Sequence, residues 1–151
     1  MRVLFLCTGN SARSQIAEAI LRHLSQGRVE AVSAGTTPTG VVHPMVGATL
    51  LEQYGIRDDS LRSKSVDEFA GAAFDAVITV CDAAAAACPS WAGARASIHW
   101  SLPDPAAIRD ADARRRAFAE VANALHARIS EWLAEASETP GPAAGDGRVR
   151  A

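Results

Sequence analysis

Eight residues near the start of the chain combine the two side-chain types that attack and bind a tetrahedral anion. Cys7 and Arg13 are separated by five residues, most of them small or loop-forming. A thiolate is a strong nucleophile, and a guanidinium can hold two oxygens of an oxyanion in a bidentate contact that orients it for in-line attack. The spacing therefore predicts that residues 7–14 form a loop that binds an oxyanion and attacks it with Cys7.

The backbone of this loop is expected to bind the anion as well. Successive N–H groups of a tight loop converge on one point, and a helix that starts at the end of the loop adds about half a positive charge. Gly9 and Asn10 tolerate the left-handed backbone that such a loop requires. The same field, with a hydrogen bond from the Ser14 hydroxyl, favours the thiolate form of Cys7. The predicted catalytic residues of the loop are Cys7, Arg13 and Ser14, and the predicted substrate-binding residues are Thr8, Gly9, Asn10, Ser11, Ala12 and Arg13. The alternative is a buried cysteine beside an ordinary strand-to-helix turn.

Alternating strand and helix patterns position this loop. Apolar and β-branched runs predict strands at residues 2–6, 29–33, 75–80 and 97–100. Helical spacing and stop signals predict helices from residue 14 to Gly27, from Pro44 to Gly55, over 83–87 with Asp82 as N-cap, and over 111–136. This order predicts an α/β fold, an open four-stranded parallel sheet with helices on both faces. Cys7 and Cys81 both follow strands, so they are expected at the same rim, where such sheets bind ligands.

Length and composition favour one intracellular enzyme domain. The chain has 151 residues, and residues 1–136 are expected to form the domain, while the Pro-, Gly- and charge-rich residues 137–151 are expected to be a disordered tail. A net charge of -2 offers no basic patch for nucleic acid, and no apolar stretch is long enough to span a membrane. No signal peptide is evident. Three cysteines, an odd number, favour reduced thiols in a reducing compartment, so a cytoplasmic protein is expected.

The loop resembles that of the low-molecular-weight protein tyrosine phosphatase family, and more specifically of the arsenate reductases built on that fold. Residues 77–82 followed by Cys88 and Pro89 are similar to the paired redox cysteines of the thioredoxin-coupled reductases. Residues 99–100 and 104–106, residues 33–36, and the stretch around Pro44 are also similar, so the resemblance covers about residues 2–133. The resemblance implies a low-molecular-weight phosphatase-like sheet with flavodoxin-like winding.

This resemblance implies that Cys7 attacks arsenate, that Cys81 then attacks the arsenylated Cys7 and releases arsenite, and that Cys88 resolves the resulting disulfide. The expected electron donor is a thioredoxin-type protein, with glutaredoxin or a small thiol as alternatives. No bound cofactor is expected, and a monomer is expected. Seven helical residues advance about 10 Å, beyond the roughly 7 Å Cα limit of a disulfide, so the segment between Cys81 and Cys88 must distort on oxidation.

The sequence departs from the family at three places. Ala12 stands where many reductases carry another cysteine, and residues 63–65 lack the carboxylate through which some of them bind potassium, so no metal site is expected. Ala106 and Ala107 follow the Asp-Pro pair where the phosphatases carry aromatic residues, which leaves nothing to stack on a phosphotyrosine ring.

Several alternatives remain open from the sequence. Asp104 is the candidate general acid for the leaving oxygen, and the alternative is that it caps a turn. Cys81 and Cys88 could be small core residues. His43 and His99 are expected to pack or to hydrogen-bond in a second layer around the site. The alternative enzyme is a phosphatase that hydrolyses phosphate monoesters with Cys7, Arg13 and Asp104, and a non-enzymatic alternative is an oxyanion-sensing protein.

Overall fold

The computed structural model describes residues 1–88 and 90–138, and a four-stranded parallel sheet organises them. The strand order is β2-β1-β3-β4, as in flavodoxin-like folds, which confirms the predicted sheet and its winding. The strands are β1 (Arg2–Cys7), β2 (Glu30–Gly35), β3 (Ala76–Thr79) and β4 (Ser97–His99). Cys7 is therefore the last residue of a central strand, paired with Gly35.

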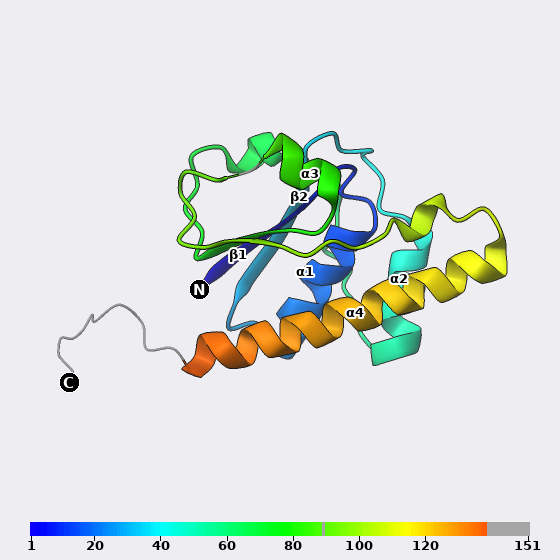
Figure 1. Cartoon of the computed structure of the whole chain (residues 1–151). Helices are drawn as coiled ribbons and strands as arrows, with labels where there is room; N and C mark the ends of the chain where they lie inside the picture. Colours follow the sequence, from blue (N-terminus) through cyan, green and yellow to red (C-terminus); the bar gives the residue numbers. More distant parts are fainter. Residues whose placement is uncertain (89, 139–151) are drawn as a thin grey trace.

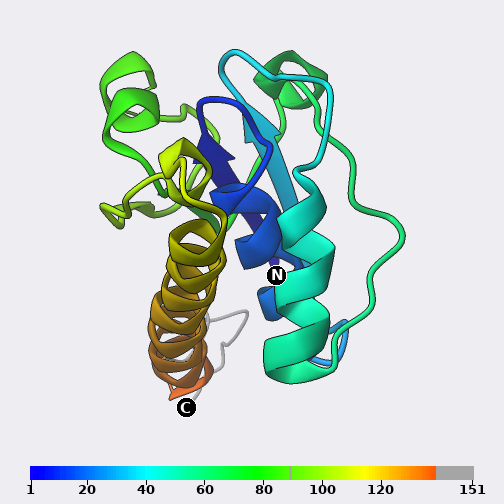
Figure 2. The same ribbon diagram turned by 90° about the vertical axis from the view of Figure 1, so that its right-hand side faces the viewer.

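Helices cover the sheet from both sides. The α-helices are α1 (Arg13–Leu24), α2 (Pro44–Tyr54), α3 (Asp82–Ala87) and α4 (Ala111–Glu138). Helices α1, α2 and α4 pack against one another in a single layer (Figure 2). The short helix α3 lies on the other side of the strands, against β1 and β3 (Figure 1).

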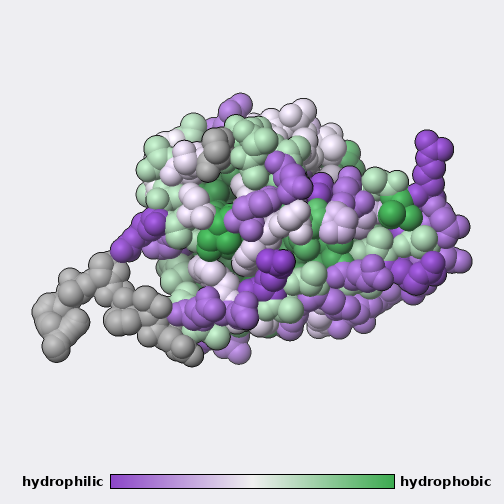
Figure 3. Space-filling model, viewed as in Figure 1, coloured by the Kyte–Doolittle hydropathy of each residue, from purple (hydrophilic) through white to green (hydrophobic). Residues whose placement is uncertain are grey.

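The hydrophobic core lies between the sheet and the layer of α1, α2 and α4. The interior of β1 is a continuous buried apolar run, as expected for a central parallel strand. Helix α4 turns one apolar stripe toward the core, and the buried residues of this stripe are Phe118, Val121, Ala122, Leu125 and Ile129. Its solvent side forms a hydrophilic band along the lower edge of the molecule (Figure 3).

The observed elements differ from the predicted ones mainly at their ends. Strand β2 runs on to Gly35, because the ladder with β1 continues to the pair formed with Cys7. Helix α4 continues to Glu138, two residues into the predicted tail, and residues 139–151 lie outside the described part of the chain. Two short 3-10 helices, η1 (Val66–Phe69) and η2 (Pro105–Ala107), were not predicted. Within the described residues, no helix is both long and apolar enough to cross a membrane.

Two neighbouring leucines of α2 test how the helix packs. Leu50 is 1% exposed and Leu51 is 44% exposed. Leu50→Ala should lower the free energy of unfolding by about 2–5 kcal/mol, because the core cannot fully close around the lost side chain. The matched control Leu51→Ala should change it by less than about 0.5 kcal/mol. Urea unfolding measures both, and equal losses would contradict this packing of α2.

Candidate active site

The loop between β1 and α1 turns its carbonyl groups outward. The carbonyl oxygens of Cys7, Thr8, Gly9 and Ser11 accept hydrogen bonds from the backbone N–H groups of Thr36, Thr37, Thr39 and His43, at 2.9–3.2 Å. The Asn10 carbonyl accepts from Gln15 Nε2 at 2.9 Å. Because the carbonyl and amide of a trans peptide unit point in opposite directions, these bonds direct the loop's amides toward its inner side. The geometry is that of an anion-binding loop.

The first turn of α1 adds to this positive electrostatic potential. Ala12 occupies the N-cap position, and its side chain makes no capping hydrogen bond. The first amides of α1 therefore lack a side-chain acceptor at the cap and are suited to an external anion. Arg13 is the first residue of the helix, and its Nη1 donates to the Leu102 carbonyl at 2.9 Å, which holds the guanidinium beside the loop.

Cys7 has two hydrogen-bonding neighbours that suit a thiolate. Its Sγ lies 2.8 Å from Ser14 Oγ and accepts from the Asn10 amide at 3.2 Å. Ser14 Oγ already accepts a hydrogen bond from Asn10 Nδ2 at 2.8 Å, so the serine hydroxyl is free to donate its own proton to the sulfur. Cys7, Asn10 and Ser14 are all buried. The predicted contact between Cys7 and Ser14 is therefore confirmed.

Asn10 is the centre of the loop's hydrogen bonds. Its φ of 47° confirms the predicted left-handed backbone. The same prediction for Gly9 is wrong, because Gly9 is not among the glycines with positive φ; a Cβ there would instead lie 3.1 Å from Thr39. The Asn10 side chain donates to Ser14 and to Ser33 Oγ, the latter at 2.9 Å, and accepts from Gln15 Nε2 and from the Lys64 amide. These four contacts hold the strained backbone in place.

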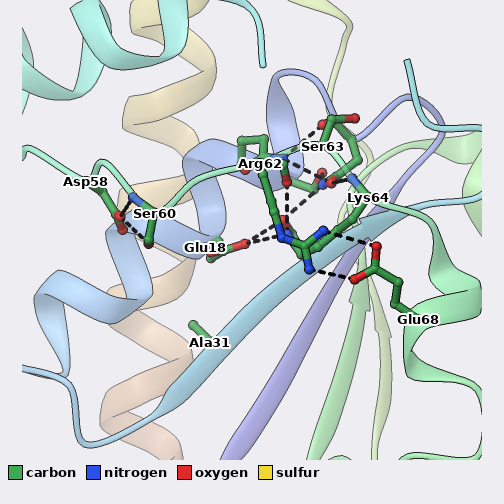
Figure 4. A network of polar contacts seen from close by, with 12 residues as sticks. Glu18, Ala31, Asp58, Ser60, Arg62, Ser63, Lys64 and Glu68 are labelled. Carbon is green, nitrogen blue, oxygen red and sulfur yellow. Dashed lines mark hydrogen bonds and ion pairs between the residues drawn. The ribbon is translucent and has the colours of Figure 1, made fainter. Parts of the chain in front are cut away.

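A buried group of charges lies behind the loop, and the sequence analysis did not identify it. Ser33 Oγ donates to Glu18 Oε1 at 2.6 Å, and Lys64 Nζ lies 3.5 Å from the same oxygen. Arg22 forms ion pairs with Glu18, at 2.6 Å, and with Asp58. Figure 4 shows Lys64, in the segment between α2 and η1, reaching toward Glu18, while its neighbour Arg62 pairs with Glu68. The anion loop is thus connected, through Asn10 and Ser33, to a buried ion pair.

The pKa shifts in this group reflect burial opposed by paired charges. Burial lowers the pKa of the Lys64 ammonium, while the carboxylate of Glu18 acts in the opposite direction. Burial also raises the pKa of Asp58, but hydrogen bonds from Ser60 and the charge of Arg22 outweigh it and lower the pKa overall. Lys64 and Glu18 are both less than one-tenth exposed, so the Lys64 ammonium needs Glu18 as a counter-charge, while Glu18 is paired with both Lys64 and Arg22.

Cys81 lies at the rim of the anion loop, as predicted. Its Sγ is 3.4 Å from Thr8 Oγ1, next to Cys7 in the chain, and 3.4 Å from the Ala84 amide. Cys81 is thus the N-cap of α3, and the prediction of Asp82 as N-cap is wrong, because Asp82 is the first helical residue. The thiols of all three cysteines are free. Cys88 caps the other end of α3, is half-buried, and lines a pocket of about 100 Å³ with Trp91 and His99.

Asp104 acts as a cap in this structure. Its carboxylate accepts from the Ala106 amide at 3.0 Å at the start of η2, so the capping interpretation is confirmed. Asp104 is exposed. It stands two residues after Leu102, whose carbonyl accepts the hydrogen bond from Arg13. Its role as general acid stays a prediction.

The two histidines make packing and second-layer contacts, as expected. His43 Nδ1 accepts from the Met45 amide at the start of α2, and its ring lies 4.8 Å from that of Phe118, centroid to centroid. His99 Nδ1 lies 2.7 Å from Thr79 Oγ1, and its Nε2 lies 2.8 Å from Asp82 Oδ1. His99 therefore joins the ends of β3 and β4 to the first residue of α3.

The sequence is related to a phosphatase family and to several arsenate reductases. Residues 2–140 match the family described as low molecular weight phosphotyrosine protein phosphatase. The chain is 33% identical to an arsenate reductase of Halalkalibacterium halodurans over 131 residues, which are 86% of this chain and 93% of the relative. It is 32% identical to a glutaredoxin arsenate reductase of Synechocystis sp. over 104 residues, 69% of this chain and 78% of that protein. The structure of a thioredoxin-dependent arsenate reductase of Corynebacterium glutamicum superposes with a TM-score of 0.70 at 29% identity, over 90% of this chain and 61% of that one.

Gly35 tests how closely the loop packs against the end of β2. A Cβ at Gly35 would lie 2.6 Å from the Thr8 carbonyl oxygen and 3.0 Å from Asn10. Gly35→Ala should therefore displace the loop and weaken the binding of inorganic phosphate by at least about tenfold, as titration calorimetry would show. The control Gly47→Ala places its Cβ in open space in α2 and should leave phosphate binding unchanged while adding about 0.5–1 kcal/mol of stability. Equal phosphate affinities in the two variants would contradict the loop packing described here.

The buried pair of Glu18 and Lys64 can be tested by removing one charge and then both. Glu18→Gln should cost about 3 kcal/mol of unfolding free energy, because it leaves the buried Lys64 ammonium without this carboxylate. Adding Lys64→Met should recover part of this loss, since the uncompensated charge is then removed. Chemical denaturation of the two variants and the wild type gives the comparison. A double variant less stable than Glu18→Gln would show that Lys64 is not the group left uncompensated.

Proposed function

The chain belongs to the low molecular weight phosphotyrosine protein phosphatase family, and we propose that it is an arsenate reductase that passes electrons through Cys7, Cys81 and Cys88. The observation that carries the proposal is the 3.4 Å contact between Cys81 Sγ and Thr8 Oγ1, which brings a second free thiol to the rim of the loop that holds Cys7. A phosphatase needs no such thiol. The names of the relatives as arsenate reductases support the same interpretation.

The first step is the attack of Cys7 on arsenate. The loop amides and Arg13 bind the oxyanion, and the hydrogen bonds from Ser14 and the Asn10 amide position the attacking sulfur of Cys7. A sulfur–arsenic bond forms as one arsenic–oxygen bond breaks. Asp104 gives its proton to the departing oxygen, which leaves as water. Arsenic is still As(V) in the resulting adduct.

The second step transfers the electrons. The Cys81 thiolate attacks Cys7 Sγ, and the sulfur–arsenic bond breaks with its electron pair passing to arsenic. Arsenic becomes As(III) and leaves as arsenite, while the two thiols are oxidised to a Cys7–Cys81 disulfide. The Ala84 amide donates to Cys81 Sγ, and the Thr8 hydroxyl lies 3.4 Å from the same sulfur, so these two contacts hold Cys81 beside the anion loop for this step.

The third step moves the disulfide away from the anion loop. The Cys88 thiolate attacks Cys81, a Cys81–Cys88 disulfide forms, and Cys7 leaves as a thiolate ready for another arsenate. Because helix α3 separates the two cysteines, it must distort in this step. A dithiol donor of the thioredoxin type then reduces the disulfide, and a glutaredoxin is the alternative donor. The proposal includes no bound cofactor or metal, and the need for reduced thiols supports a cytoplasmic location.

The three cysteines can be tested separately in a coupled assay. With thioredoxin, thioredoxin reductase and NADPH, arsenate should cause NADPH oxidation by the wild type, and each of Cys7→Ser, Cys81→Ser and Cys88→Ser should reduce the rate at least about 100-fold, because each removes one step of the relay. Replacing thioredoxin by glutaredoxin and glutathione in the same assay identifies the donor.

Hydrolysis of an aryl phosphate is the control for the anion loop. It needs only Cys7, Arg13 and an acid, so it should disappear in Cys7→Ser and persist in Cys81→Ser and Cys88→Ser. A wild type that hydrolyses the aryl phosphate but oxidises no NADPH with either donor would identify a phosphatase and refute the proposed reductase.

A further inference from the structure

Few side chains of helix α3 can bind it to the rest of the protein. Its sequence is one aspartate followed by five alanines, and only Ala84 is buried. Asp82 is therefore the one residue within α3 whose side chain can form a hydrogen bond or an ion pair, and its Oδ1 lies 2.8 Å from His99 Nε2.

His99 is itself held in place from the sheet. Its Nδ1 lies 2.7 Å from Thr79 Oγ1, and Thr79 and His99 are paired residues of β3 and β4. A carboxylate only accepts hydrogen bonds, so Nε2 of His99 carries a proton and donates a hydrogen bond to Asp82. Hydrogen bonds from His99 and then Ser101 lower the pKa of Asp82, which keeps the carboxylate ionised. The imidazole is thus a fixed donor aimed at the first residue of α3.

The chain on either side of α3 is anchored. Val80 joins the end of β3 to Cys81, and its amide donates a hydrogen bond to the Leu6 carbonyl. Beyond Cys88, Trp91 Nε1 donates to the Ala72 carbonyl at 2.9 Å, and its ring packs edge-on against Phe74. Any rearrangement that brings Cys88 to Cys81 must therefore take place between these anchors, and Asp82 is its first helical residue.

We propose that the hydrogen bond between Asp82 and His99 is a latch that holds α3 in the reduced conformation, and that His99 is a positioning residue for the thiol relay. With the latch closed, Cys81 stays capped on α3 beside the anion loop, as the attack on Cys7 requires. The latch opens when Cys88 attacks Cys81; the new sulfur–sulfur bond forms as the bond to Cys7 breaks, with no net change in oxidation state. The inference rests on the proposed Cys81–Cys88 disulfide.

An equilibrium measurement that needs no arsenate tests the latch. In a Cys7→Ser background, the full-length protein is equilibrated with mixtures of reduced and oxidised glutathione, and the Cys81–Cys88 disulfide is quantified by acid quench, alkylation and mass spectrometry. Asp82→Ala should shift the equilibrium toward the disulfide on the order of two- to tenfold, the usual contribution of one hydrogen bond. Alanine is the better helix former, so helix propensity alone predicts the opposite shift.

A double-mutant cycle separates the pair from its surroundings. His99→Phe keeps an aromatic ring but removes both nitrogens, and it should shift the equilibrium in the same direction as Asp82→Ala but no further, because Asp82→Ala also removes the hydrogen bond from Ser101. Adding His99→Phe to Asp82→Ala should give no further shift. Asp82→Asn should stay close to the background protein, because its amide oxygen still accepts from Nε2. The matched control Asp112→Ala removes an exposed carboxylate from the first turn of α4 and should have no effect.

Two results would overturn the latch: additive shifts from Asp82→Ala and His99→Phe, or a shift from Asp82→Ala no larger than that from Asp112→Ala. A protein that forms no Cys81–Cys88 disulfide in oxidised glutathione would overturn it as well. The coupled arsenate assay reports separately on the reductase, so the latch can fail while the proposed function stands.

Discussion

The outward direction of the carbonyl groups in residues 7–11 is the constraint on which the site depends. A loop can present its amides to an anion only if its carbonyls find hydrogen bonds elsewhere, because buried unpaired carbonyls are costly. Here the segment that follows β2 supplies the N–H groups of Thr36, Thr37, Thr39 and His43. The end of β2 must pass close to the loop to do this, and Gly35 permits that approach because it has no side chain. The anion site is therefore built jointly by two adjacent parallel strands and the segments that leave them.

The hydrogen bonds behind the loop extend this dependence into the core. Asn10 donates to both Ser14 and Ser33, and Ser33 donates to Glu18 beside the buried Lys64. Because each hydroxyl accepts from one neighbour and donates to the next, the proton of Ser14 is directed toward Cys7. The cost of burying these polar groups is offset only when every member is paired. A network of this kind favours one arrangement of the loop over many loosely packed alternatives.

In the proposed thiol relay, helix α3 meets two opposing requirements. It has to be ordered while Cys81 faces the anion loop, and it has to distort when Cys88 attacks Cys81. Its alanines give high helix propensity with almost no buried side chain, so little packing is lost when it opens. Its order in the reduced state then depends on a few polar contacts, those of Cys81 with the Ala84 amide and of Asp82 with His99. Weak, specific contacts are suited to an element that has to change shape in every cycle.

The sequence alone determined the elements and the chemistry that local patterns encode. Apolar runs and helical spacing predicted the four strands, the principal helices and their order, and the spacing of Cys7 and Arg13 predicted the anion loop. The places of Cys81 and Cys88 at the two ends of α3 followed from strand and helix signals in the same way. Only the tertiary structure decided the contacts between distant segments: Lys64 beside Glu18, residues 36–43 around the loop, and His99 against Asp82. No local spacing predicts these contacts, because they form only when the sheet brings separate segments together. A single lysine or histidine in the sequence does not indicate which residue it will contact. Cys81 as the N-cap of α3 was missed for a related reason, since a sulfur atom is a weak acceptor and Asp82 is the more usual cap.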